Sequence, residues 1–128
     1  MALAYSFRHD SSGRLSVEGV KLIDLGVQLG HQSVVLLVGL TPEADQRVSV
    51  RVQLHPAGGQ ATLPPDIKLA LLSPSSKVLQ ELRARSQDNL VQLKRFTCPV
   101  GQRFSIQVAL GDFSLTEEFV VELPEGNV

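Results

Sequence analysis

Alternation of apolar and polar residues with a period of two is the feature that most constrains the fold of this chain. In residues 47–55, apolar side chains at even positions alternate with polar side chains at odd positions. The same alternation occurs in residues 23–29 and 104–110. Successive side chains of a strand point to opposite faces, so this period predicts strands with one buried and one solvated face. On the apolar faces we expect buried side chains at Val50, Val52, Leu69, Ile106, Val108 and Phe119.

Four segments depart from simple alternation. Residues 34–38 and 67–72 are apolar at both parities, which is typical of central strands covered on both faces or of short buried helices. Their length and β-branched content favour strands. Residues 113–123 keep apolar side chains at odd positions except at Glu117, which predicts a β-bulge or a strand break there. Residues 77–85 could form a strand or a helix. The neighbouring strands favour a strand with Val78, Leu82 and Ala84 on one face.

Turn residues separate these segments about every ten residues, a spacing typical of all-β sandwiches and barrels. Gly111 and Asp112 lie between two alternating segments and predict a two-residue hairpin turn. The 128 residues suffice for one core. We therefore expect an all-β fold, an antiparallel β-sandwich of seven or eight strands that is immunoglobulin-like in general shape. Residues 1–19 would form a leader or an extra edge strand, residues 20–123 the sandwich, and residues 124–128 a frayed tail.

Composition and motifs argue against several classes of function. Hydrophobic residues make up 43% of the chain and the net charge is −1, as in a folded protein that binds neither nucleic acid nor a membrane surface. Cys98 is the only cysteine and has no base beside it in the sequence, and the three histidines lie in separate segments. We expect a non-enzymatic cytoplasmic protein without a metal ion or another cofactor.

Charge is distributed unevenly along the second half of the chain. Residues 77–103 contain six basic and two acidic residues, a net charge of +4, whereas residues 104–128 contain five acidic residues and no basic one. Cross-strand ion pairs between neighbouring strands would explain this pattern without a partner. The alternative is a basic surface that binds an acidic protein or a second copy of the chain. Its candidate residues are Arg83, Arg85, Lys94 and Arg95.

Several longer segments resemble the C-terminal region of a family of uncharacterised cyanobacterial proteins, known only as a domain of unknown function. They are residues 21–30, 34–39, 50–56, 63–69, 84–89, 92–96 and 101–111. The resemblance covers residues 21–121 and implies a part of a cytoplasmic protein, with no catalytic residues to transfer. Residues 1–19 do not match what it implies, so the chain is either an excised domain with a substituted leader or a short natural relative.

We interpret the chain as a protein-interaction or assembly module. The alternative is a β-sandwich that binds a small molecule or a carbohydrate. The scarcity of aromatic residues, with no tryptophan and one tyrosine, weakens the carbohydrate alternative. A deep polar pocket would favour a small ligand, and an exposed apolar or basic surface would favour a protein partner.

Overall fold

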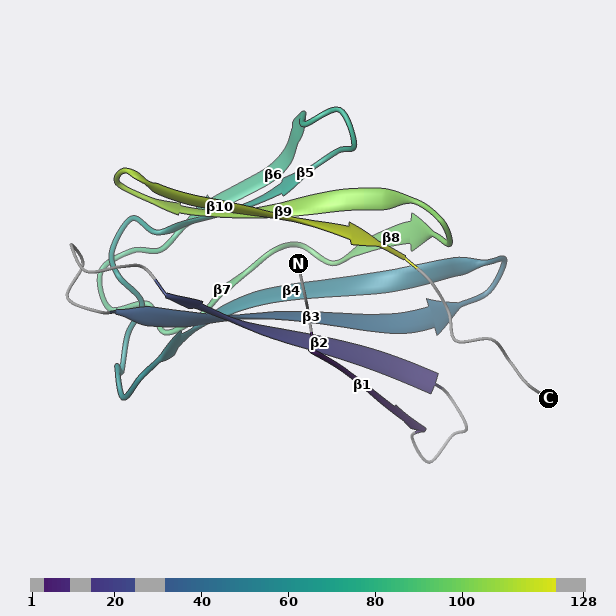
Figure 1. Cartoon of the computed structure of the whole chain (residues 1–128), viewed down its shortest axis with the longest axis horizontal. Coiled ribbons are helices and arrows are strands. Elements are labelled where there is room, and N and C mark those ends of the chain that lie inside the picture. The colour runs from purple at the N-terminus through teal and green to yellow at the C-terminus, as the bar shows by residue number, and fades with distance from the viewer. Residues whose placement is uncertain (1–3, 10–14, 25–31, 122–128) are drawn as a thin grey trace.

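Two antiparallel sheets form the structure (Figure 1). The computed structural model describes the backbone of residues 4–9, 15–24 and 32–121 and the side chains of residues 32–121. These residues include ten strands and no helix, and eight of the strands have five residues or more. The all-β prediction is therefore confirmed, and these eight longer strands correspond to the expected seven or eight.

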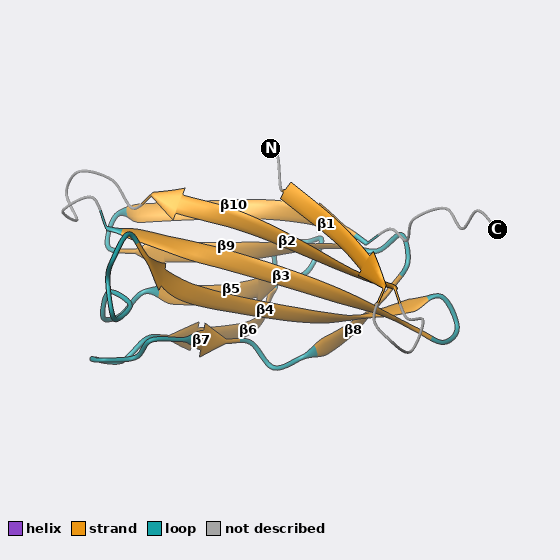
Figure 2. Ribbon diagram, turned by 90° about the horizontal axis from the view of Figure 1, so that it is seen from below, coloured by secondary structure: helices purple, strands orange, loops and turns teal. Residues whose placement is uncertain are grey.

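The first sheet contains six strands in the order β1-β2-β3-β4, with two short strands on the far side of β4 (Figure 2). Its members are β1 (Ala4–His9), β2 (Leu15–Asp24), β3 (Ser33–Glu43), β4 (Arg47–Ala57), β7 (Val91–Gln92) and β8 (Phe96–Pro99). Both β7 and β8 pair with β4, each along a different part of it. The proposed division of the chain at residue 20 stays a prediction, and the expected frayed tail at 124–128 lies outside the described residues.

The second sheet has the order β10-β9-β5-β6. Its strands are β5 (Lys68–Leu72), β6 (Val78–Arg83), β9 (Arg103–Leu110) and β10 (Phe113–Val120). Gly111 and Asp112 alone connect β9 to β10, as predicted. Gly111 has a φ of 58°, the backbone conformation that a type II′ turn requires at its first central position and that glycine adopts without strain.

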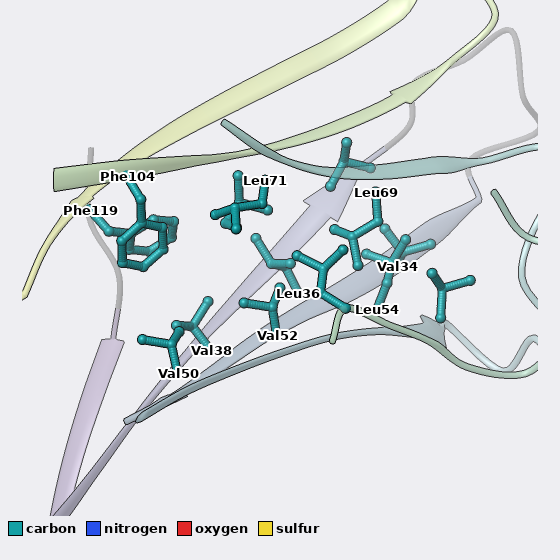
Figure 3. Packing of buried hydrophobic residues seen from close by; sticks show 14 of the residues in the cluster. Val34, Leu36, Val38, Val50, Val52, Leu54, Leu69, Leu71, Phe104 and Phe119 are labelled. Atoms are coloured by element: carbon teal, nitrogen blue, oxygen red, sulfur yellow. The ribbon is translucent and has the colours of Figure 1, made fainter. Parts of the chain in front are cut away.

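One hydrophobic core fills the space between the sheets (Figure 3). The first sheet contributes mainly valines and leucines of β3 and β4, and the second contributes residues of β5, β9 and β10. The six side chains expected on apolar faces are all buried, with exposures between 0% and 7%. Phe104 lies at one end of the core, where its ring stacks on Phe119 at 5.3 Å and meets the edge of Phe96 at 5.4 Å.

The expected bulge or break at Glu117 is wrong. The register of β10 on β9 is continuous from Phe113 to Val120, and Glu117 pairs with Ile106 on the inward face. Its side chain is 4% exposed. The hydrogen-bond ladder and the apolar residues on either side keep the strand in register, so a single carboxylate is carried into the interior rather than expelled by a bulge.

The expected inward face of residues 77–85 is only partly correct. Ala84 is buried, but Val78 is 50% and Leu82 41% exposed. The register of β5 on β6 shifts at this point: Leu71 pairs with Gln80 but Leu72 pairs with Val78, which leaves Leu79 as an extra, bulged residue. The bulge turns Val78 to the outer face of the sheet. Leu82 lies on the edge strand of the described sheet, where it stays 41% exposed.

Candidate functional site

Three of the four predicted basic residues lie on two segments that meet at one edge of the molecule. Arg83 ends β6, and Lys94 and Arg95 follow β7. The side-chain amide of Gln80 joins the two segments: its Nε2 donates to the carbonyl oxygen of Lys94 at 2.9 Å, and its Oε1 accepts from the Lys94 amide at 2.8 Å. We call the surface formed by β6 and residues 94–99 the β6–β8 edge.

Gln80→Ala is expected to lower the free energy of unfolding by about 1–3 kcal/mol, because two hydrogen bonds between the sheets are lost and each contributes about 0.5–1.5 kcal/mol. Urea denaturation followed by circular dichroism measures the loss. Gln92→Ala is the matched control, since it removes an exposed side chain whose described bond is to Gln53. Equal losses in both variants would show that Gln80 does not hold the sheets together.

Arg85 takes a different position from the other three residues. It lies in the turn after β6, where its backbone amide donates to Asp88 Oδ2 at 2.7 Å and its side chain pairs with the same carboxylate at 3.8 Å. That side chain is 88% exposed. Arg85 therefore belongs to a local turn and extends outward from the β6–β8 edge.

The ion pairs of the described residues show which basic residues of the segment 77–103 pair with acidic residues of the segment 104–128. Arg103 of β9 pairs with Glu118 of β10 at 3.8 Å, as cross-strand pairing predicts. Arg83 pairs instead with Glu81 of its own strand at 3.9 Å. Because β6 and β10 form opposite edges of the second sheet, Arg83 and Arg85 do not pair with Glu117 or Glu118. Glu122 of the acidic segment lies outside the described residues. Neither Lys94 nor Arg95 forms an ion pair with a described residue.

Exposed apolar side chains accompany these cations, a feature that the sequence did not indicate. Leu79 is 54% exposed, Val78 50% and Leu82 41%, all on β6, and Leu90 in the following turn is 40% exposed. Four of the five large exposed hydrophobic residues of the described side chains therefore lie in residues 78–90. The sequence pattern grouped Val78 with Leu82 and Ala84 on one face. It could not show that Val78 and Leu82 are exposed, because the bulge at Leu79 and the edge position of β6 depend on pairing with β5.

A cavity of about 260 Å³ opens beside Leu79, between β6 and β8. Leu71, Phe96, Cys98 and Phe104 line it together with Leu79, and Arg103 carries the only charge among its described lining residues. Its wall is thus mainly apolar with a cation at one side. We did not expect this cavity, because its walls come from four separate strands and turns.

Cys98 forms part of the cavity wall and is 4% exposed. Burial raises the pKa of its thiol above the ordinary value of 9.0, so the group is a neutral thiol at neutral pH. We expect iodoacetamide to modify Cys98 much more slowly in the native protein than in urea. As the pH rises, the unfolded chain loses this proton first. The contribution of the buried thiol to stability is therefore present below about pH 9 and declines above it.

The pH prediction is checked by comparing melting temperatures of the natural chain and Cys98→Ala between pH 7 and 10. Relative to Cys98→Ala, the melting temperature of the natural chain should fall as the pH rises above 9. A constant difference would contradict the assignment, because other titrating groups are common to both proteins.

The described residues contain no group of three or more histidine, cysteine or carboxylate side chains placed to hold a metal ion. In the part of the chain that the structure describes, no helix is long and apolar enough to span a membrane.

Comparison with known proteins gives a family and no further match. No curated protein and no solved structure matches the chain. A family described as "Protein of unknown function (DUF1822)" matches residues 1–120. The match includes the first nineteen residues, which we had set apart from the resemblance, so the expectation that they fall outside the family pattern is wrong. Since the match covers nearly the whole chain, this chain belongs to the DUF1822 family of proteins of unknown function.

Proposed function

We propose that this protein is a non-enzymatic interaction module that binds a protein partner through the β6–β8 edge. The observation that carries the proposal is the group of exposed apolar side chains on an edge strand, with Arg83 at the end of that strand and Lys94 joined to it through Gln80. Exposed apolar patches rimmed by polar residues mark binding surfaces, and an excess of one charge attracts partners of the opposite charge.

The proposal also covers the type of fold and the larger protein to which the module belongs. The two sheets would form an immunoglobulin-like β-sandwich, and the module would be the C-terminal region of a cytoplasmic cyanobacterial protein. Binding of a small molecule is the second candidate, favoured by the cavity beside Leu79. The cavity, at about 260 Å³, is smaller than the roughly 300–1,000 Å³ usual for ligand sites, so we place the protein partner first.

Charge reversal tests the proposal. In the variant Lys94→Glu with Arg95→Glu, no described ion pair is lost, and we expect the melting temperature to stay within a few degrees of the natural value. Association with an acidic partner should be slower at low salt, because opposite charges accelerate encounter. Reversing Arg83 and Arg85 to glutamate should also slow association, and Arg83 should contribute more of the effect than Arg85.

The measurement uses a partner captured from a cyanobacterial lysate, identified, purified and passed over immobilised protein at low and high salt. The control variant, Ser114→Glu with Thr116→Glu, adds negative charge to exposed positions of β10 at the opposite edge of the sheet. Equal association rates for the natural chain and the Lys94 and Arg95 variant would remove this edge from consideration. A large fall in melting temperature would assign these cations a structural role instead.

A further inference from the structure

The bulge in β6 changes which side chain lies at the cavity. An edge strand normally has side chains that alternate between the two faces of its sheet, but the extra residue here is Leu79, and it lies at the opening of the cavity. Bulges commonly redirect a side chain next to a binding site. Leu79 is more than half exposed while contributing to the cavity wall, so it is available to a ligand from outside.

The cavity beneath Leu79 fits an apolar side chain. Leu71 is 3% exposed and Phe104 4% exposed, and Phe96 is fixed against Phe104 by an edge-to-face contact. A wall made of side chains that are anchored in the core is preformed, so an occupant does not bear the cost of ordering it. The volume of about 260 Å³ is ample for one leucine-sized side chain.

The basic residues near the cavity indicate that the rest of the ligand is acidic. Arg103 is the only charged residue among the described lining of the cavity, and Lys94 and Arg95 lie along the same edge. The pair between Arg103 and Glu118 joins atoms 3.8 Å apart on side chains that are about 60% exposed. Exposed pairs of this kind contribute little, so Arg103 can exchange Glu118 for a carboxylate of a ligand at small cost.

The backbone favours an extended ligand. Within the described residues, β6 is the last strand of its sheet, so one side of it pairs with β5 and the other faces outward. Ala84 exchanges its backbone hydrogen bonds with Asp66 and Ile67 on the β5 side. Because these groups alternate in direction along a strand, Glu81 and Arg83 direct theirs outward, where an extended chain can bind them.

We propose that the β6–β8 edge binds an extended acidic segment of a partner protein, which places one apolar side chain in the cavity beside Leu79. This inference rests on the proposed function and deepens it, since it names the chemistry of the partner. The apolar side chain supplies affinity by its burial, and the flanking carboxylates meet Arg103, Lys94 and Arg95. A second copy of the chain is the competing occupant.

The test uses three acetylated peptides and the intact protein. The first has the sequence Glu-Glu-Val-Leu-Val-Glu-Glu, the second has serine in place of leucine, and the third has lysine in place of each glutamate. Titrations are followed by the methyl resonances of Leu71 and Leu79, which line the cavity, and of Leu115, which lies on β10 at the other edge of the sheet. We expect the first peptide to shift Leu71 and Leu79 but not Leu115.

The serine peptide should bind about tenfold more weakly, because burial of a leucine side chain is lost, and the lysine peptide should not bind. Leu79→Glu should abolish the shifts at Leu71. Its matched control, Val120→Glu, changes an exposed apolar residue on the edge strand β10 and should bind normally.

Each failure has a separate meaning. Equal binding of the leucine and serine peptides, sensitive to Lys94→Glu with Arg95→Glu, would overturn the cavity inference and leave the proposed function standing. No binding of either acidic peptide, together with unchanged capture of a protein partner by the charge-reversed variant, would overturn both. Concentration-dependent dimerisation that Leu79→Glu abolishes would identify a second copy as the occupant and overturn the acidic segment.

Discussion

Phe104→Ala is expected to lower the free energy of unfolding by about 3–5 kcal/mol, the range usual for removing a buried aromatic ring. The ring is 4% exposed, stacks on Phe119 and contacts the edge of Phe96. It therefore joins β10, β9 and β8 and so connects the two sheets. Truncation removes apolar burial and leaves a void next to the existing cavity. Urea denaturation monitored by circular dichroism measures the loss.

Phe113→Ala is the control for this prediction. Phe113 is half-buried beside the β9–β10 turn and packs only at the margin of the core, so its truncation should cost clearly less. If both variants lost the same stability, the aromatic cluster around Phe104 would not be the point at which the sheets are held together.

Ile106→Ala is expected to cost about 2–5 kcal/mol, because the isoleucine is 1% exposed and lies on the inward face of β9 between β5 and β10. Gln107→Ala, one position along the same strand, should change stability by no more than about 0.5 kcal/mol, since that side chain lies on the outward face. Comparison of the two unfolding curves tests the register of β9 directly. A larger loss at Gln107 than at Ile106 would mean that the strand faces the other way.

The exposed apolar edge also bears on solubility. A strand at the end of a sheet can pair with other chains, and natural proteins limit this with bulges and charged residues. Here β6 has both, the bulge at Leu79 and the charges of Glu81 and Arg83. These features limit unspecific pairing of the edge strand with other chains.

Local pattern was sufficient for much of the fold. Period-two alternation identified β4 and β9 and the inward side chains at Val50, Val52, Ile106 and Val108, because alternate burial is a property of the strand itself. The hairpin turn at Gly111 and Asp112 was equally local, since its backbone conformation depends on the glycine. The basic character of residues 77–103 was also evident from the sequence, because charge is a property of the residues alone.

Only the tertiary structure showed which side chains are buried or exposed where this depends on how the strands pair. Glu117 is buried because the continuous register of β10 on β9 keeps this position on the inward face. The pattern of one strand alone does not show that pairing with β9 would keep a carboxylate there. Val78 and Leu82 are exposed because β6 is an edge strand with a bulge opposite β5, and both facts require the order of strands in the sheet. The cavity beside Leu79 depends on residues far apart in sequence that meet only after the sheets pack. The sequence by itself therefore determined the alternating strands β4 and β9, their apolar faces and the charge of the basic segment, which are local properties. Only the packed sheets determined which strand forms the edge of the second sheet, because strand order depends on contacts between residues far apart in the sequence.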